Sequence, residues 1–205
     1  MLTYLALGDS YTIGEQVPYT GNFPNQTVAL LRKQNIEVSD PVIIATTGWT
    51  TDELLAAIRE KALNETFSFV SLLIGVNNQY RGRTLENYQE EFTQLLTRSI
   101  HFANGHSDKV FVLSIPDWGV TPFAEGKDRT QIAVEIDAYN AAAKTITVAH
   151  KCHFIDITDS TRANGIKEDF LAEDKLHPSA KEYRVWAERF FSVLVKNVNT
   201  GANKK

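Results

Sequence analysis

Hydrophobic residues in this chain occur in two alternating patterns, short unbroken runs and longer stretches with helical spacing. The unbroken runs are typical of strands covered on both faces, and they lie at 2–7, 38–46, 67–74, 109–115 and 152–157. The stretches with the spacing of an amphipathic helix lie at 24–34, 51–63, 84–103, 129–150 and 179–197.

This alternation predicts an α/β fold. Parallel strands need crossover connections, which are usually helical and right-handed. We expect a three-layer, flavodoxin-like fold, in which a five-stranded parallel sheet of strand order 2-1-3-4-5 carries helices on both faces. Residues 1–198 should form one domain, and residues 199–205 a short flexible tail.

Composition fits such a domain and narrows its partners. The chain has 205 residues, of which 43% are hydrophobic and 22% charged, so it can bury a sizeable core. Its net charge is -4 and its basic residues are scattered, which argues against nucleic acid or an anionic membrane surface as the main partner. No apolar run approaches the length of a transmembrane helix, so integral membrane association is not expected.

Two further features bear on location. No signal peptide is visible, because Met1 is followed at once by the first strand, and this predicts a cytoplasmic protein. The single cysteine, Cys152, excludes an intrachain disulfide and offers no metal-site spacing.

A serine follows the first strand in a position that suits catalysis. Gly8 should break the strand and deliver Ser10 at its carboxyl end, the edge at which open α/β sheets place their ligands. We therefore hypothesise that Ser10 is a nucleophile. Asp9 beside it is better explained as a hydrogen-bond acceptor that holds the loop.

A serine nucleophile needs an imidazole to accept its proton, and His177 is the best placed of the five histidines. Asp174 lies three residues before it, and Pro178 after it starts the last helix. A carboxylate at this spacing can hold Nδ1–H and turn Nε2 toward the serine. The other four histidines lie at helix ends or at the far end of the sheet and are better read as structural.

Attack on an ester carbonyl also requires hydrogen-bond donors for the developing oxyanion. Gly48 follows the second strand and Asn77 the third, on the edge that carries Ser10. The backbone N–H groups of Ser10 and Gly48 and the Asn77 amide are therefore the candidate donors. A plain turn explains Gly48 or Asn77 taken singly, but their joint placement beside one serine favours the oxyanion hole.

Several residues after strand ends are candidates for a substrate pocket, although packing explains each of them about equally well. They are Trp49, Tyr80, Arg81, Trp118 and Phe123. No long apolar lid is present, which favours a short-acyl esterase over a long-chain lipase.

Four short segments together resemble the sequence blocks of the SGNH (GDSL-type) hydrolase family. The segments are Gly8-Asp9-Ser10 with Gly14, then Gly48, then Gly75-Val76-Asn77-Asn78, and last Asp174-Lys175-Leu176-His177-Pro178. They span nearly the whole chain in the family's order. Two positions depart from it: Asn78 stands where Asp is usual, and Tyr11 stands where Leu is common, which should alter the pocket wall.

The resemblance implies a Ser10–His177–Asp174 triad, an oxyanion hole formed by Ser10, Gly48 and Asn77, and no metal or organic cofactor. The α/β-hydrolases are set aside because their G-x-S-x-G elbow is absent. The expected substrate is a small acyl ester; a sugar O-acetyl ester, a lysophospholipid and an acyl thioester all remain open. A non-catalytic, flavodoxin-like binding module is the alternative, although the chain lacks a glycine-rich phosphate cradle.

Overall fold

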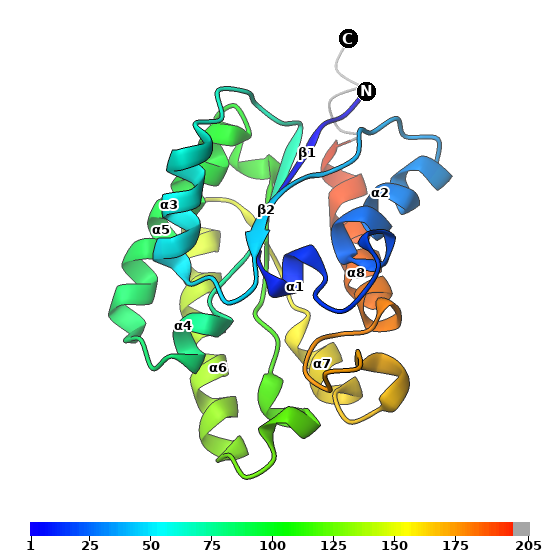
Figure 1. Ribbon diagram of the computed structural model, residues 1–205. Coiled ribbons are helices and arrows are strands. Elements are labelled where there is room, and N and C mark those ends of the chain that lie inside the picture. The colour runs from blue at the N-terminus through cyan, green and yellow to red at the C-terminus, as the bar shows by residue number, and fades with distance from the viewer. Residues whose placement is uncertain (199–205) are drawn as a thin grey trace.

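A five-stranded parallel sheet forms the centre of the molecule (Figure 1). Its strands are β1 (Tyr4–Asp9), β2 (Val42–Thr46), β3 (Phe69–Leu73), β4 (Val110–Leu113) and β5 (His153–Ile155). Their order is β2-β1-β3-β4-β5, as the sequence predicted. The computed structural model describes residues 1–198, so the predicted tail at 199–205 lies outside the described residues.

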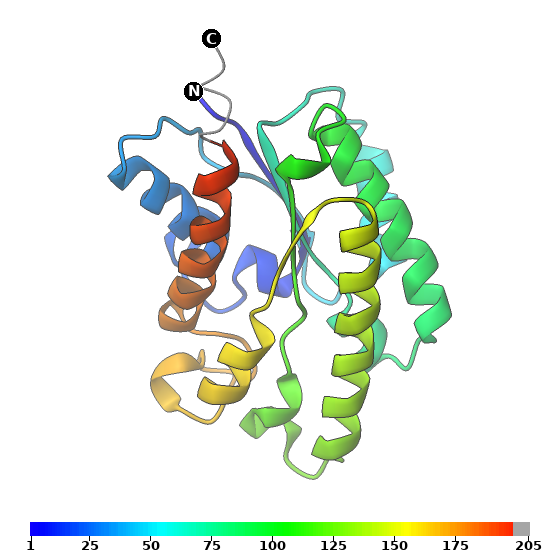
Figure 2. The same cartoon turned by 180° about the vertical axis from the view of Figure 1, so that it is seen from behind.

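Helices cover both faces of this sheet. The helices are α1 (Ser10–Ile13), α2 (Phe23–Lys33), α3 (Thr51–Lys61), α4 (Val76–Tyr80), α5 (Leu85–Phe102), α6 (Arg129–Ala149), α7 (Thr158–Asn164) and α8 (Ala180–Val198). Single 3-10 turns lie at η1 (Tyr19–Gly21), η2 (Ser107–Lys109), η3 (Trp118–Val120), η4 (Pro122–Ala124) and η5 (Glu168–Phe170). The pair α2 and α8 packs on one face, and α3, α5 and α6 pack on the other (Figures 1 and 2).

The three central strands are fully buried, whereas the edge strands β2 and β5 are partly exposed. This difference explains why the central strands appear in the sequence as unbroken hydrophobic runs. Phe190 of α8 contacts the rings of Tyr4, Phe69 and Phe111, so the last helix packs across three neighbouring strands. In residues 1–198, no helix is long and apolar enough to cross a membrane.

The expectation that Gly8 ends the first strand is wrong. The strand continues through Gly8 and Asp9, which pair with Ala45 and Thr46 of β2. A Cβ at Gly8 would lie 2.1 Å from Thr12 Oγ1 and 2.4 Å from the carbonyl oxygen of Leu73. Glycine at this position therefore allows a close approach of chain segments rather than a break.

Three short helices were missed. Helix α1 begins directly at Ser10, and α4 and α7 each follow a strand end. All three have only one or two turns, so the hydrophobic spacing that reveals a longer helix is absent from them. Two of these helices carry residues predicted for the site.

Candidate active site

Ser10 lies at the first turn of α1, at the carboxyl end of β1. Asp9 begins this helix as its cap, because its Oδ1 accepts a hydrogen bond from the Tyr11 N–H at 3.0 Å. The serine side chain is thereby presented at the edge of the sheet rather than within it. Ser10 is only 3% exposed.

The structure brings Ser10, His177 and Asp174 together. Ser10 Oγ lies 2.9 Å from His177 Nε2, and His177 Nδ1 lies 2.5 Å from Asp174 Oδ2. Nδ1 therefore faces a carboxylate that can hold its proton, which leaves Nε2 to accept one from the serine. The predicted acid, base and hydroxyl thus form one hydrogen-bonded chain.

Asp174 also orders the loop that carries His177. Its Oδ1 accepts the backbone N–H groups of Leu176 at 3.0 Å and His177 at 2.9 Å. Although partial burial raises its pKa, the hydrogen bonds from His177 and from these N–H groups hold the pKa of Asp174 below its usual value. The carboxylate therefore stays ionised beside the imidazole.

Gly48 lies in the turn after β2, with a φ of 84° that only glycine adopts without strain. Its carbonyl oxygen accepts a hydrogen bond from Arg81 Nη2 at 2.6 Å. The next carbonyl, that of Trp49, accepts one from Asn77 Nδ2 at 3.0 Å. Two side chains of the α4 region thus hold the backbone of this turn in place.

Asn77 follows β3 in α4, and its amide nitrogen makes two contacts. Besides the Trp49 carbonyl, Nδ2 lies 3.3 Å from Asp9 Oδ2. Burial raises the pKa of Asp9 to about 7, against the lowering effect of hydrogen bonds from the Tyr11 N–H and the Asn77 amide. Both amide hydrogens of Asn77 therefore face protein acceptors in this structure.

Asn78, where the resembled family usually has Asp, is fully buried. Its Oδ1 accepts the Thr51 N–H at 3.1 Å, and its Nδ2 donates to Thr51 Oγ1 at 2.6 Å. An asparagine satisfies both contacts, because it offers an acceptor and a donor. The residue joins α4 to the start of α3.

An open cleft of about 170 Å³ contains Ser10 and His177; we call it the active-site cleft. Its lining consists of Ser10, Tyr11, Thr47, Gly48, Val76, Asn77, Tyr80, Trp118, Phe123, Leu176 and His177. The lining combines polar groups with the aromatic rings of Tyr80, Trp118 and Phe123. Trp118 contacts Tyr80 and Phe123 edge-on, with centroid distances of 5.2 and 6.1 Å.

Of the five residues predicted for the substrate pocket, Tyr80, Trp118 and Phe123 line the active-site cleft. Trp118 is buried, and its Nε1 donates to Gln79 Oε1 at 2.7 Å, which fixes the indole. Trp49 and Arg81 do not line the cleft. Trp49 packs against the core, and the Arg81 guanidinium lies against the Gly48 carbonyl and Glu53.

Tyr11 lines the cleft, as its expected place in the pocket wall requires, whereas three lining residues were not predicted: Thr47, Val76 and Leu176. Each is a sequence neighbour of a residue that was predicted. Adjacency could have identified them, since a side chain next to a site residue in a tight loop has few other places to lie.

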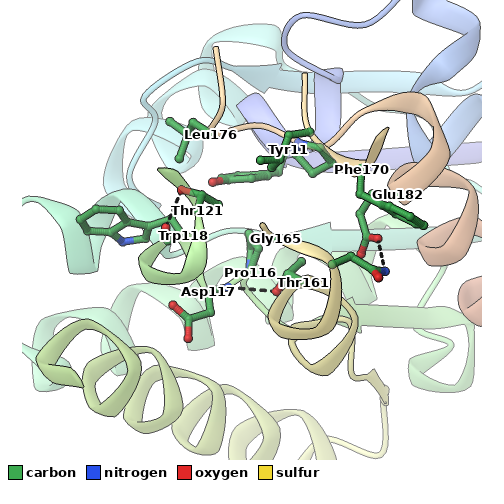
Figure 3. Close-up of a pocket in the computed structure, with 13 residues that line it drawn as sticks. Tyr11, Pro116, Asp117, Trp118, Thr121, Thr161, Gly165, Phe170, Leu176 and Glu182 are labelled. Atoms are coloured by element: carbon green, nitrogen blue, oxygen red, sulfur yellow. Dashed lines mark hydrogen bonds between the residues drawn. The ribbon is translucent and has the colours of Figure 1, made fainter. Parts of the chain in front are cut away.

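A second, smaller hollow of about 20 Å³, which we call the inner cavity, adjoins this cleft (Figure 3). It lies between η3, α7 and the loop that precedes α8, and it shares Tyr11, Trp118 and Leu176 with the active-site cleft. Its two carboxylates have protein partners. Asp117 accepts from Arg162, and Glu182 accepts from Ser160, Asn164 and Trp186.

Comparisons with known proteins identify similar families and structures. The model of the GDSL-like Lipase/Acylhydrolase family matches residues 6–185. No curated protein sequence matches.

Solved structures share the fold at low sequence identity. Acetylxylan esterase Axe2 from Geobacillus stearothermophilus is 19% identical, with a TM-score of 0.74 over 94% of each chain. The psychrotrophic esterase EstA from Pseudoalteromonas sp. is 15% identical, with a TM-score of 0.73 over 97% of this chain and all of that one. A lipase/acylhydrolase from Enterococcus faecalis is 21% identical, with a TM-score of 0.73 over 94% of each.

Proposed function

Because this chain belongs to the GDSL-like lipase/acylhydrolase family and is a carboxylic ester hydrolase, we propose that Ser10, His177 and Asp174 cleave short acyl esters in the active-site cleft. The observation that carries this proposal is the continuous hydrogen-bonded chain from Ser10 Oγ through the imidazole to Asp174. Family membership also favours a hydrolase over the non-catalytic binding module that the sequence left open.

The first step is acylation. Ser10 Oγ attacks the ester carbonyl carbon while its proton passes to His177 Nε2. Asp174 stabilises the imidazolium that forms, since its carboxylate accepts Nδ1–H. The imidazolium then donates its proton to the leaving alcohol oxygen, and the acyl group remains on Ser10.

The negative charge that develops on the carbonyl oxygen needs donors on the other side of the serine. The N–H groups of Ser10 and Gly48 and the Asn77 amide are the proposed set. The longer contact of Asn77 Nδ2, at 3.3 Å to Asp9, is the one we expect to yield to the oxyanion. The hold of Arg81 on the Gly48 carbonyl supports this arrangement, because it fixes the turn in advance.

The second step is deacylation. A water molecule takes the place of the alcohol, His177 removes its proton, and the hydroxide equivalent attacks the acyl carbon. Collapse of the second tetrahedral intermediate returns the proton to Ser10 and releases the carboxylic acid. The cleft is open, so water can reach the acyl group without a moving lid.

The charges around the cleft narrow the class of possible substrates. Among the residues that line it, only His177 can carry a full positive charge. The nearby Arg81 is engaged by the Gly48 carbonyl and Glu53. A phosphate-bearing substrate, such as a lysophospholipid or a nucleotide-linked thioester, would find no Lys or Arg among the lining residues, so we propose a neutral ester.

The aromatic wall supports an acylated sugar. Tyr80 and Phe123 are 53% and 44% exposed at the mouth of the cleft, and flat rings of this kind can pack against the apolar face of a pyranose. The structurally similar Axe2 is an acetylxylan esterase, which agrees with this choice of substrate. A short-chain ester of a carbohydrate hydroxyl is therefore the proposed class.

Two assays test the proposal. Wild-type protein should hydrolyse p-nitrophenyl acetate and release acetate from acetylated xylo-oligosaccharides, and Ser10→Ala should abolish both activities without changing the melting temperature. An alkyl fluorophosphonate should label Ser10 stoichiometrically, as located by peptide mass spectrometry. Ser192→Ala, which removes an exposed hydroxyl of α8, is the matched control. Undiminished turnover by Ser10→Ala would overturn the nucleophile assignment.

A further inference from the structure

One buried acid beside the nucleophile has no part in the mechanism described above. Asp9, at the end of β1, is fully buried and forms no ion pair within residues 1–198. A carboxylate in such a place is costly, because neither water nor a counter-ion stabilises its charge. The presence or absence of a proton on Asp9 therefore matters to the groups that it touches.

The two oxygens of Asp9 contact different parts of the site. Oδ1 accepts the Tyr11 N–H at 3.0 Å and so caps α1. Oδ2 accepts a hydrogen bond from Asn77 Nδ2 at 3.3 Å. Because Oδ1 already has a fixed N–H donor, a proton on Asp9 belongs on Oδ2, the oxygen that faces Asn77.

The Asn77 amide has two hydrogens, and both are in use. One is donated to the Trp49 carbonyl at 3.0 Å, and the other to Asp9 Oδ2. An oxyanion in the active-site cleft can gain a hydrogen bond from this amide only if one of the two contacts gives way. The Trp49 carbonyl is always neutral, so the contact whose strength can change is the one to Asp9.

The strength of that contact depends on the proton of Asp9. A hydrogen bond to an ionised carboxylate is roughly twice as strong as one between neutral groups. A buried carboxylate also repels a second negative charge that develops close to it. Ionised Asp9 therefore retains the amide hydrogen and opposes the oxyanion, whereas neutral Asp9 does neither.

The groups around Asp9 do not neutralise its charge. Three tyrosines face it, Tyr11 of α1, Tyr88 of α5 and Tyr183 of α8, and burial raises the pKa of each phenol, so all three stay uncharged. The contacts to β2 and α4 are made with uncharged residues, and the imidazole of the site bonds the serine instead. Burial raises the pKa of Asp9 itself to about 7, so its charge changes near neutral pH.

We propose that Asp9 and the oxyanion compete for one amide hydrogen of Asn77, so that Asp9 must carry its proton for this donor to act. This inference rests on the proposed function. It makes Asp9 a positioning residue that acts through Asn77. Activity should consequently have an alkaline limit, because loss of the Asp9 proton removes one oxyanion donor and leaves Ser10 and His177 in place.

The test is a pH profile of kcat/KM between pH 6 and pH 9.5. Ethyl acetate is the substrate, acetate release is measured, and the uncatalysed rate is subtracted. In the wild type we expect kcat/KM to fall above about pH 7, by roughly 10²-fold in total, which is the effect of losing one oxyanion donor. Asn77→Ala should start near that lower level and show no such fall, because it has no donor to lose.

Asp9→Asn gives the sharpest contrast with wild type. Its side chain cannot ionise, and while Oδ1 keeps the Tyr11 N–H it presents no acceptor to Asn77. Its kcat/KM should therefore stay level to pH 9.5 and exceed that of wild type about tenfold or more at that pH. Asp40→Asn, which neutralises an exposed acid, is the matched control and should keep the wild-type profile.

Three outcomes would overturn the inference. One is a wild-type profile that stays level to pH 9.5, and another is a fall that persists unchanged in Asn77→Ala. The third is an Asp9→Asn variant that loses rate at every pH and keeps the fall, as a merely structural role predicts. Should Asp9→Asn not melt cooperatively, the comparison of wild type with Asn77→Ala decides.

The proposed function can fail separately. A wild type that hydrolyses no ester at any pH overturns the proposed function and this inference with it. A wild type that hydrolyses esters, with the same pH profile in all three variants, overturns the inference alone.

Discussion

The two halves of the proposed active site are built in different ways. The acid–base half, Asp174 and His177, is held by contacts within one short loop. Asp174 accepts hydrogen bonds from the His177 imidazole and from the backbone N–H groups of Leu176 and His177. The proposed oxyanion half is assembled from three separate strand ends. Asn77 reaches Trp49, 28 residues away, and Asp9, 68 residues away.

The carboxyl groups of the two halves also differ, in burial and in pKa. Asp174 is partly exposed and accepts three donors, and its pKa lies below the usual value. Asp9 is fully buried, forms no ion pair within residues 1–198, and its pKa rises to about 7. The local half therefore keeps a charged carboxylate beside the proposed base, whereas the assembled half holds a carboxyl group whose charge is costly. Four experiments can break or sharpen this comparison.

The largest effect should come from the local half. His177→Ala removes the base, and we expect kcat to fall by about 10⁴-fold or more, because triad members act as a unit. The double variant Ser10→Ala/His177→Ala should be hardly slower than either single one. Steady-state assays with p-nitrophenyl acetate measure this, with the exposed His101→Ala as control. Additive losses would contradict a single catalytic unit.

In the assembled half, Asn77→Ala should lower kcat by roughly 10²-fold with little change in KM, as for the loss of one oxyanion donor. Asn78→Ala, one residue on, should instead lower the melting temperature, since Asn78 ties α4 to α3. Kinetics and thermal melts of both variants decide the matter. A normal kcat for Asn77→Ala would mean that its amide serves only the turn.

A smaller effect is expected at Arg81. Its guanidinium holds the Gly48 carbonyl, so Arg81→Ala should loosen the Gly48 N–H and lower kcat by about tenfold, with KM nearly unchanged. Arg83→Ala removes an arginine that pairs with Asp52 instead, and it should leave kcat unchanged. If Arg81→Ala raised KM and spared kcat, Arg81 would belong to substrate binding, as first expected from the sequence.

The smallest effect concerns stability. Between about pH 4 and about pH 7, folded Asp9 keeps a proton that the unfolded chain has released, so a rising pH lowers the free energy of unfolding across this window. Asp9→Asn should remove this slope, and thermal melts from pH 4 to pH 8 would show it as a difference of several degrees between the two proteins.

Asp174 should show the opposite pH dependence, which Asp174→Asn would remove. Because the pKa of Asp174 is lowered in the folded protein, its contribution to the free energy of unfolding is present above the usual titration range and disappears only as the pH falls below about 4.

For the Asp9 prediction, melting temperatures of wild type and Asp9→Asn that change in parallel with pH would contradict a buried Asp9 that keeps its proton.

The same division explains what the sequence could reveal. Strand order followed from unbroken runs separated by helices, and the family resemblance followed from four short segments. The Asp174–His177 contact is local, so its spacing alone suggested it. The partners of Asn77 and Arg81 were hidden, because they depend on how two strand-end loops meet.

Gly8 illustrates another limit of prediction from the sequence. Glycine is equally compatible with a turn and with a close packing contact, and only the position of Thr12 and of the Leu73 carbonyl shows that the second explanation holds. Likewise, Tyr11 could be recognised as unusual beside Ser10, but its ring contacts could not be predicted. They are made with His177 and Trp186, which come from distant segments.

The distance along the chain between Ser10 and His177, 167 residues, has a consequence for biosynthesis. The ribosome makes the serine with the first strand, yet its proposed base arrives just before α8, whose Trp186 and Phe190 must bury themselves against the rest of the core. On the proposed assignment, Ser10 of a nascent chain lacks its base until the final helix docks. Esterase activity would consequently report completion of folding, and refolding experiments could use it as a late-stage clock.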